Sequence, residues 1–372
     1  MSAELRAEDL VLVHDYLIQM GGAERVVACM AAAYPASPIY TAAIESAGLL
    51  PEFQGRDIRT TWLQRLPGIQ RNFKKVFPLY PAAFATLPLE RRRAAWISSS
   101  TFAKCVRMPA GMASFLYCHS PTRFLWDTEI YVGSEVGNPA VRLLIRLLLP
   151  WLRRTDRAAA RRMTAIVANS ENVRDRIRDC YGRESSVIYP PVAVKRFSVS
   201  HEHGGYYLIL SRLIAYKNVE LAVRVFAKNG RQLRIIGTGT DRERLERLAE
   251  GRVQFLGRVD DAARQRELQG AKALIFPGEE DFGIAPVEAM ACGKPVIALR
   301  KGGALETVID NETGVFFETP TDAALSAAVE RLESIDWHPQ TIRRQAERFS
   351  EEHFLKNMRH FMEEHLAKGT AQ

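Results

Sequence analysis

Cysteine is scarce in this sequence of 372 residues, and its five copies lie far apart. Cys29, Cys105, Cys118, Cys180 and Cys292 are odd in number and include no C-x-x-C pair. This pattern excludes a disulfide framework and a cysteine-based zinc cluster, and it is typical of proteins in a reducing cytosol.

Long apolar runs are also missing. Residues 1–10 contain three acidic side chains and no apolar core, so we expect no signal peptide. A spanning helix needs about 20 consecutive apolar residues, and the nearest approach, residues 143–152, is interrupted by Arg146 and Pro150. We therefore expect a protein that does not cross a membrane.

No D-x-D motif follows any of the strands that the sequence predicts, and there is no low-complexity tract. Paired aspartates at a strand end are a common way to hold a divalent cation through carboxylate oxygens. We therefore expect no obligatory metal ion and assign no metal-binding residues.

Acidic residues are too few to balance the basic ones, which leaves a net charge of +8. The whole excess lies in the first half, because residues 1–190 contain 25 basic and 17 acidic side chains, whereas residues 191–372 contain 26 of each. Such clustering favours attraction of the first half to phosphates or to an anionic membrane. A general role in solubility is the alternative.

Strand-length apolar runs alternate with amphipathic helical stretches, which predicts an α/β fold with parallel sheets. Tyr189-Pro190-Pro191-Val192 separates two such series and marks a domain hinge. We predict two doubly wound, Rossmann-like domains, at 1–190 and 191–345, and a C-terminal helix at 346–372 that packs back on the first domain. The predicted strands are 10–17, 94–98, 113–118 and 165–168, then 206–213, 232–236, 253–256, 273–276, 295–299 and 314–317. Two facing domains of this kind would leave a ligand cleft along the carboxyl ends of their strands.

The densest motif occupies residues 280–293, with the sequence E-D-F-G-I-A-P-V-E-A-M-A-C-G. It predicts a loop, a helix with Pro286 in its first turn, and a helix end at Gly293. The amides of Phe282, Gly283, Ile284 and Ala285 would face an anion at the helix start. Glu280 and Glu288 would add two acceptors for sugar hydroxyls, although Glu288 in a capping role is the other interpretation.

Basic residues and glycines follow other predicted strands. Arg212 and Lys217 lie close enough in sequence to neutralise both phosphates of a diphosphate. Gly21-Gly22 would admit a phosphate close to the backbone, or form a plain turn, and Gly237 with Gly239 would admit a nucleobase.

His119 directly follows the predicted strand 113–118. Because strand ends line the cleft of such a fold, His119 is a candidate for contacting a reacting sugar. A histidine with no role in a loop is the alternative.

Several motifs together resemble the retaining glycosyltransferases of family 4, which have the GT-B fold. They include H-D-Y-L-x₃-G-G-A-E-R-V, Y-C-H-S-P, A-N-S-E-N-V, Y-P-P-V, S-R-L-x₃-K-N, F-L-G-R-V, the 280–293 motif and G-G-x-x-E-T-V, and they cover nearly the whole chain. The sequence is most similar to bacterial O-antigen and exopolysaccharide mannosyltransferases.

The resemblance implies a role for each candidate residue. Glu288 would bind the nucleotide ribose, Glu280 the transferred sugar, and Arg212 with Lys217 the diphosphate. His119 would lie against the donor sugar and the acceptor. Gly21 and Gly22 would touch the phosphates.

A retaining reaction through a covalent intermediate needs a carboxylate at the anomeric carbon, and the matching strand end has His119. The resemblance therefore implies a front-face reaction in which the departing diphosphate helps to deprotonate the acceptor. The donor is a nucleotide sugar, with GDP-mannose favoured and a UDP-sugar possible, and the acceptor is a lipid-linked oligosaccharide. No further cofactor is expected.

The segment from Gly257 and Arg258 to Asp260 and Asp261 bears on the donor base. A carboxylate accepts both adjacent donors of guanine, and we match Asp261 to this role, with Asp260 as the alternative. Either acid beginning the next helix is the other interpretation.

Two stretches contain the clustered charge. Residues 62–93 and 141–162 each have seven basic side chains and one acid, beside aromatics or leucines. This combination suits an interfacial segment on an anionic leaflet, whereas an amphipathic core helix and a solvated loop are the alternative. We expect a peripheral protein on the cytoplasmic face of a bacterial plasma membrane, and no nucleic-acid partner, because no nucleic-acid motif accompanies the charge.

Rival functions are a catalytically silent nucleotide-sugar-binding scaffold and an epimerase of the same shape. Transfer or hydrolysis of the donor would separate an enzyme from a scaffold.

Overall fold

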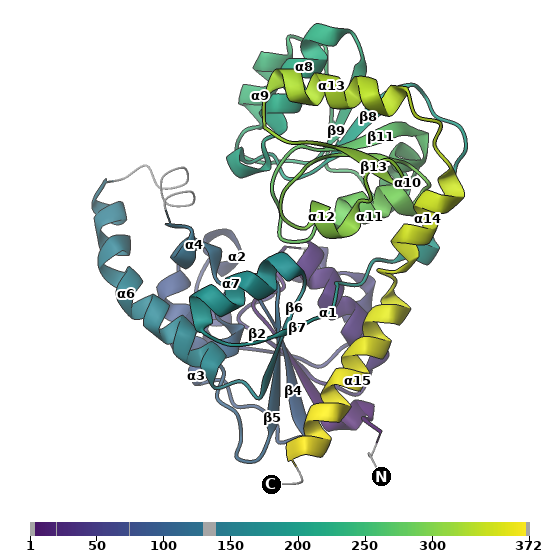
Figure 1. Cartoon of the computed structure of the whole chain (residues 1–372). Helices are drawn as coiled ribbons and strands as arrows, with labels where there is room; N and C mark the ends of the chain where they lie inside the picture. The colour runs from purple at the N-terminus through teal and green to yellow at the C-terminus, as the bar shows by residue number, and fades with distance from the viewer. Residues whose placement is uncertain (1–3, 20, 74, 129–138, 370–372) are drawn as a thin grey trace. The chain divides into compact units, whose positions relative to one another are not determined.

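The computed structural model describes residues 4–19, 21–73, 75–128 and 139–369. The chain forms two compact units, Met1–Pro191 with Phe354–Gln372, and Val192–His353 (Figure 1). The second boundary lies at His353 and Phe354 rather than at residue 345. The reason is that α14 (Pro339–Glu347) belongs to the second unit, where the guanidinium of Arg343 donates hydrogen bonds to the carbonyls of Phe197 and Ala291.

The first unit contains a seven-stranded parallel sheet in the order β3-β2-β1-β4-β5-β6-β7. Its chain reverses direction across the sheet between β1 and β4, which is the switch point of a doubly wound fold. The strands are β1 (Leu10–His14), β2 (Ile39–Thr41), β3 (Ile58–Thr60), β4 (Ala94–Ser99), β5 (Ala113–Cys118), β6 (Ala165–Ala168) and β7 (Ser186–Val187).

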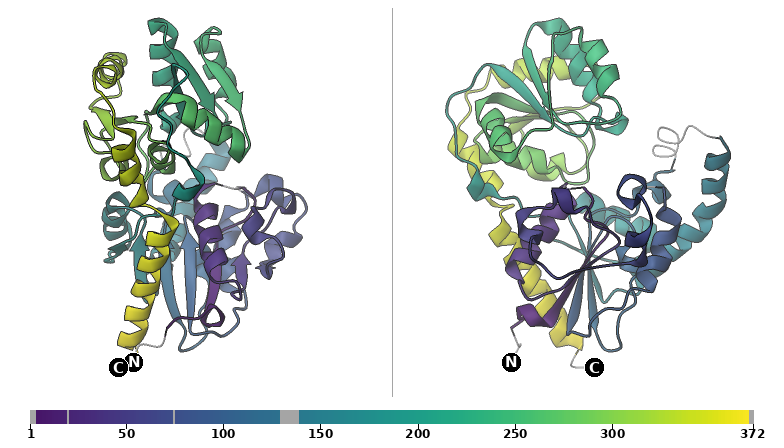
Figure 2. Two further views of the ribbon diagram at one scale, coloured as in Figure 1. Left: turned by 90° about the vertical axis from the view of Figure 1, so that its right-hand side faces the viewer. Right: turned by 180° about the vertical axis from the view of Figure 1, so that it is seen from behind.

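Helices cover both faces of this sheet (Figure 1 and Figure 2). Alternate residues of β1 show why: Leu10 and Leu12 pack in one apolar core, and Val11 and Val13 in another. The helices of the first unit are α1 (Gly22–Ala33), α2 (Ile69–Asn72), α3 (Tyr80–Ala85), α4 (Arg123–Trp126), α6 (Pro139–Arg161), α7 (Glu171–Tyr181) and, from Phe354 onward, α15 (Glu351–Gly369).

Helix α15 packs on the first sheet through Phe354, Met358 and Phe361, which are buried. The rings of Phe354 and Tyr117 lie 5.6 Å apart, and those of Phe361 and Phe115 lie 6.0 Å apart. These edge-on contacts attach the C-terminal segment to β5.

The second unit contains a six-stranded parallel sheet in the order β10-β9-β8-β11-β12-β13, with its switch point between β8 and β11. All six strands expected in this half are present, so that prediction is confirmed. The strands are β8 (Tyr206–Leu210), β9 (Gln232–Ile236), β10 (Gln254–Gly257), β11 (Ala271–Phe276), β12 (Val296–Leu299) and β13 (Gly314–Phe317).

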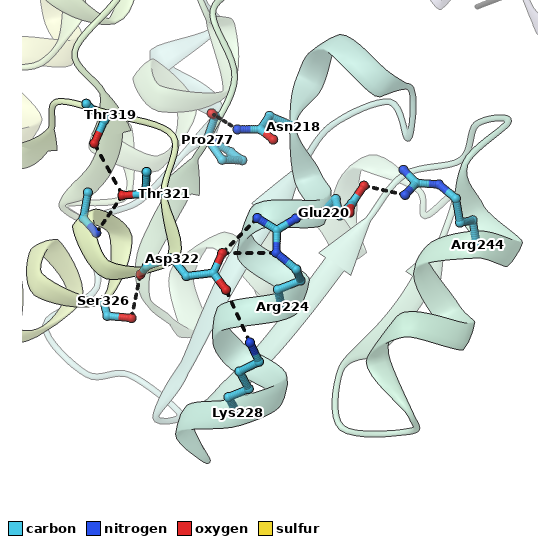
Figure 3. A network of polar contacts seen from close by, with 11 residues as sticks. Asn218, Glu220, Arg224, Lys228, Arg244, Pro277, Thr319, Thr321, Asp322 and Ser326 are labelled. Atoms are coloured by element: carbon cyan, nitrogen blue, oxygen red, sulfur yellow. Dashed lines mark hydrogen bonds and ion pairs between the residues drawn. The ribbon is translucent and has the colours of Figure 1, made fainter.

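Ion pairs join the helices of this unit, as Figure 3 shows. Arg224 lies on α8, and its Nη2 is 2.8 Å from Oδ1 of Asp322 at the start of α13. Arg244 of α9 pairs with Glu220 of α8. These helices are α8 (Val219–Asn229), α9 (Arg242–Ala249) and α13 (Asp322–Glu333), and the unit also contains α10 (Asp261–Gly270), α11 (Ile284–Ala291) and α12 (Ala304–Thr307).

None of the helices within the described residues combines the length and the apolar character that crossing a bilayer requires.

Candidate active site

In both units most candidate residues follow the carboxyl ends of strands at or near the switch point. In the second unit, β8 leads into the loop with Arg212 and Lys217, and β11 leads into the loop with Glu280. These are the two strands between which the winding reverses. This is the position at which doubly wound sheets bind ligands.

Lys217 and Glu280 meet directly. Their Nζ and Oε1 atoms are 2.5 Å apart, and the side chains are 11% and 23% exposed. Arg212 lies in the same loop as Lys217, and its Nη2 is 3.1 Å from the hydroxyl of Tyr216. The structure thus brings together three of the predicted residues, and it adds Tyr216, which no sequence motif indicates.

The two loops are fixed to each other by backbone contacts. Asn218 adopts a left-handed conformation with φ of 52°, and its side-chain Nδ2 donates to the main-chain carbonyl of Pro277 at 3.3 Å (Figure 3). A side chain on Gly278 would meet the carbonyl oxygen of Lys217 at 2.7 Å. The position of Lys217 against Glu280 is therefore held by close packing of the main chains rather than by the ion pair alone.

The expected helix after this loop is α11, and it begins at Ile284. Gly283 precedes it with φ of 91°, and Gly293 follows it in a left-handed conformation, so the predicted helix end is confirmed. The amides of Ile284 and Ala285 lie in the first turn, where the helix supplies them with no carbonyl partner. The ring of Phe282 is buried against Phe349 at 5.4 Å, so only its main chain can serve a ligand.

Glu288 and Asp261 are linked through Arg264. Oε1 of Glu288 is 3.2 Å from one terminal nitrogen of Arg264, and Oδ1 of Asp261 is 3.3 Å from the other. The side chain of Glu288 is 5% exposed, whereas that of Asp261 is 59% exposed. Arg264 was not predicted, because one arginine on a charged helix has no distinguishing pattern.

Asp260 and Arg258 complete the segment after β10. The carboxylate of Asp260 accepts from the amide of Ala263 at 2.6 Å and caps α10. The helix-start interpretation therefore holds for both acids, because Asp260 is the cap of α10 and Asp261 is its first residue, where it also pairs with Arg264 of the same helix. Arg258 is exposed, and it follows β10 at the edge of the sheet, two strands away from β8.

The glycines after β9 lie against the loop that follows β8. A side chain on Gly237 would meet the carbonyl oxygen of Ser211 at 1.8 Å, and one on Gly239 would meet that of Leu213 at 2.1 Å. These glycines therefore make room for the loop after β8, and contact of a nucleobase with Gly237 stays a prediction.

In the first unit, His119 begins a row of polar side chains at the switch point. Its Nε2 lies 2.7 Å from Oγ of Ser98, and the same hydroxyl lies 3.1 Å from Nδ1 of His14. Nε2 of His14 is 3.8 Å from Oε1 of Glu24 at the start of α1. The sequence predicted only the first member of this row.

The first glycine loop ends in the same row. Gly21 caps α1, and its amide donates to Oε2 of Glu24 at 2.8 Å. The amide of Gly21 is thus engaged with Glu24, and contact of Gly21 and Gly22 with the phosphates stays a prediction. Gly22 is the first residue of the helix, where its amide has no partner from the helix itself.

The two histidines of this row have pKa values shifted in opposite directions. Burial and the positive charge of His14 lower the pKa of His119 to about 3, although the negative charge of Asp15 acts in the opposite direction. Burial opposes protonation of His14 as well, but hydrogen bonding to Glu24 and attraction by Glu24 and Asp15 raise its pKa. His14 therefore holds the proton of this pair, and His119 is a neutral group suited to a sugar hydroxyl.

Neutral His119 leads to a prediction for nuclear magnetic resonance. Its imidazole signals are expected to stay constant between pH 8 and 5, because the folded state disfavours its proton. An unfolded histidine gains its proton near pH 6.5, so the contribution of His119 to stability falls as the pH drops from there toward 3. A spectrum of His119→Gln identifies the signal, and a midpoint near 6.5 would show that the site does not exclude the charge.

Asp15 stabilises the loop after β4. Its carboxylate accepts from the amides of Ser100 at 2.6 Å, Thr101 at 2.9 Å and Ala103 at 2.8 Å. Burial opposes its charge, but attraction by His14 and Lys104 and these amides lower its pKa. Asp15 thus holds together the ends of β1 and β4, between which His14 and Ser98 meet.

The two basic stretches differ in structure. In residues 62–93, Tyr80 and Phe84 are buried in the core, so the core-packing interpretation holds for these aromatics, and Lys74 lies outside the described residues. The second stretch forms α6, where Leu143, Leu147 and Trp151 are 60%, 70% and 51% exposed.

Comparison with known proteins gives two family matches. Residues 20–196 match "Glycosyltransferase Family 4", and residues 194–349 match "Glycosyl transferases group 1". Together the matches cover both units.

Curated relatives match over short segments. The alpha-1,3/1,6-mannosyltransferase ALG2 of Candida glabrata is 35% identical over 105 residues, which are 26% of this chain and 23% of that protein. The phosphatidyl-myo-inositol mannosyltransferase of Mycobacterium leprae is 40% identical over 106 residues, 27% of this chain and 28% of that protein. The matched segments therefore span less than a third of each relative.

Solved structures match over nearly the whole chain. Sucrose-phosphate synthase from Thermosynechococcus elongatus has a TM-score of 0.73 at 18% identity, covering 97% of this chain and 100% of that one. Anabaena Alr3699/HepE in complex with UDP has a TM-score of 0.68 at 17% identity, covering 95% and 99%. At these identities the likeness concerns the fold.

Proposed function

The chain belongs to glycosyltransferase family 4 and has the GT-B fold, and from this premise we propose that it transfers mannose from GDP-mannose to a lipid-linked oligosaccharide. The observation behind the choice of sugar is the similarity to mannosyltransferases in two separate relatives. The anomeric configuration would be retained.

We assign the donor to the carboxyl edge of the second sheet. Lys217 and Arg212 would bind the diphosphate, and the amides of Ile284 and Ala285 would add donors to it. Glu280 would accept from hydroxyls of the sugar, and Glu288 from those of the ribose. This assignment is supported by the contacts among Arg212, Tyr216, Lys217 and Glu280.

The reaction exchanges one bond to the anomeric carbon for another. The bond from that carbon to the diphosphate oxygen breaks, and a bond to the acceptor oxygen forms on the same face. The acceptor proton passes to the departing diphosphate. Lys217 and Arg212 would lower the barrier by stabilising the negative charge that grows on the diphosphate. The edge of the first sheet with neutral His119 would serve the acceptor side.

Guanine is the proposed base because of Asp261. Both acids are exposed, but the carboxylate of Asp260 accepts from the amide of Ala263, whereas that of Asp261 lies beside Arg264, which also contacts Glu288. A carboxylate accepts from both N1–H and the N2 amine of guanine, whereas uracil presents one N–H between two carbonyls.

Calorimetric titration tests the base. GDP is expected to bind more tightly than UDP, and Asp261→Asn is expected to narrow the difference. Asp260→Asn is the matched control, because asparagine still caps a helix. UDP binding as tightly as GDP would move the chain to the second candidate, a transferase for UDP-sugars, which the UDP complex of HepE favours.

We further propose that the protein is peripheral to the cytoplasmic face of the plasma membrane. Exposed Leu143, Leu147 and Trp151 lie on α6 beside exposed Arg146. An apolar ridge next to basic side chains suits the boundary between headgroups and acyl chains.

Vesicle binding tests this location. Vesicles with anionic lipid are expected to bind the protein at low salt and to release much of it at high salt. Arg146→Ser is expected to weaken the binding by about 1 kcal/mol. Arg92 and Arg93 should contribute less, because Arg92 pairs with Glu90 and Arg93 with Asp9. Equal binding to neutral and anionic vesicles would contradict the proposal that electrostatic attraction contributes to membrane binding.

A further inference from the structure

The C-terminal half of α6 borders a basic hollow of about 560 Å³. Trp126 forms one wall, and the helix contributes Arg153, Arg154, Arg157 and Arg161. Among the described residues that line the hollow, none is acidic. Four guanidinium groups around one concave surface suit a ligand with more than one negative charge, of which a diphosphate is the simplest example.

Three of the four arginines are held by hydrogen bonds to main-chain carbonyls. Nε of Arg153 donates to the carbonyl of Leu125 at 2.6 Å, Nε of Arg157 to that of Cys180 at 2.7 Å, and Nε of Arg161 to that of Tyr181 at 2.9 Å. Because each bond uses the inner nitrogen, the terminal nitrogens of Arg157 and Arg161 can turn toward a ligand. Ordering these side chains in advance lowers the entropy that binding costs.

Trp126 supports two of them through its ring. The guanidinium carbons of Arg157 and Arg153 lie 5.1 and 5.7 Å from the ring centre. The indole nitrogen donates to Oδ2 of Asp156 at 2.9 Å, which fixes the ring. Asp156 is fully buried and paired with Lys104, so its charge is balanced away from the hollow.

The apolar ridge continues into the hollow along one face of the helix. Positions three or four residues apart lie above one another on an α-helix. Such spacing joins the exposed apolar side chains to the basic ones: Leu143, Leu147, Trp151, Arg154, Ala158 and Arg161. The same face is therefore apolar over its first half and basic over its second.

We propose that this face binds the phosphate or diphosphate group of a lipid, with the guanidinium groups around the phosphates and the lipid chain along Leu143, Leu147 and Trp151. This proposal rests on the proposed function, because the lipid that we assign to this face is the lipid-linked acceptor. A nucleic acid would use the charge but not the ridge.

Vesicles of neutral lipid with a small fraction of a long-chain alkyl diphosphate provide the probe. A second set contains phosphatidylglycerol at the same surface charge. The protein is expected to bind the diphosphate vesicles at least about tenfold more tightly, because each charged hydrogen bond adds to the affinity. Equal binding to both sets would overturn the proposal, since leaflet charge alone would then explain it.

Variants separate the arginines from general charge. The triple change R154S/R157S/R161S is expected to lose the tenfold preference, and R154K/R157K/R161K to lose most of it, because lysine keeps the charge without the two-pronged geometry. The control R107S/R174S/R178S removes three charges elsewhere in the same unit and is expected to keep the preference. A serine variant within twofold of the parent would contradict the site.

Competition with soluble pyrophosphate separates a lipid from a free phosphate. We expect pyrophosphate to compete weakly, and L143S/L147S to reduce vesicle binding without changing the affinity for pyrophosphate. Competition as strong as that of the lipid diphosphate would assign the hollow to a soluble anion. GDP titration of the same variants reports on the donor site separately, so failure of either proposal can be recognised.

Discussion

Glu288→Ala and Lys217→Ala are each expected to weaken donor binding by about 1.5–3 kcal/mol, which is one to two decades in affinity. Glu288 is nearly buried beside Arg264, and Lys217 beside Glu280, so each would meet the donor at a site with little water. The affinity for GDP by calorimetry, and kcat/KM with a competent donor, measure the effect.

Glu333→Gln is the matched control. Glu333 pairs with Arg231 and Lys272 and accepts from the hydroxyl of Tyr207, and both Tyr207 and Lys272 are second residues of their strands. It therefore lies at the amino edge of the same sheet. We expect Glu333→Gln to leave donor binding unchanged. If Glu288→Ala and Lys217→Ala both had kinetics within twofold of the parent, the donor would not bind at the assigned site.

Lys104→Met is expected to reduce the free energy of unfolding by about 3–5 kcal/mol, the range for breaking a buried ion pair. Lys104 and Asp156 are both fully buried, with Nζ and Oδ1 2.9 Å apart. The substitution leaves the charge of Asp156 without its partner. Urea unfolding followed by tryptophan fluorescence measures the change, because Trp62, Trp96, Trp126 and Trp151 all lie in the first unit.

The double change Lys104→Met with Asp156→Leu is the informative comparison. Removing both charges is expected to recover much of the loss, since an apolar pair avoids the unpaired carboxylate. If Lys104→Met alone had the same urea midpoint of unfolding as the parent, the buried ion pair between Lys104 and Asp156 would be contradicted.

Much of the fold could be predicted from the sequence because its strands are buried on both faces. In the second unit, β8, β12 and β13 are short, largely apolar and buried runs, and β11 is buried except at Lys272. The strands β2, β3 and β7 were missed, because each has only two or three residues and no room for a pattern. Strand 10–17 was predicted too long, since His14 ends β1 and the apolar residue Leu17 only forms a single bridge.

The candidate site was predictable where function depends on a local motif. Glu280, Glu288 and Gly293 lie in one continuous segment, whose loop and helix follow from proline and glycine positions. Arg264 and the row from His119 through Ser98 to His14 were not predictable, because they depend on side chains from separate strands and helices. Gly237 shows the reverse case, since a glycine suggests a close approach but does not reveal what approaches.

Transfer of labelled sugar tests the central claim most directly. The protein is incubated with labelled GDP-mannose and a bacterial lipid extract, in parallel with labelled UDP-glucose and with the Glu288→Ala variant. We predict label in the lipid fraction from GDP-mannose, much less from UDP-glucose, and a loss of one to two decades in rate with the variant. No lipid-bound label from GDP-mannose, together with efficient transfer from UDP-glucose, would contradict the account.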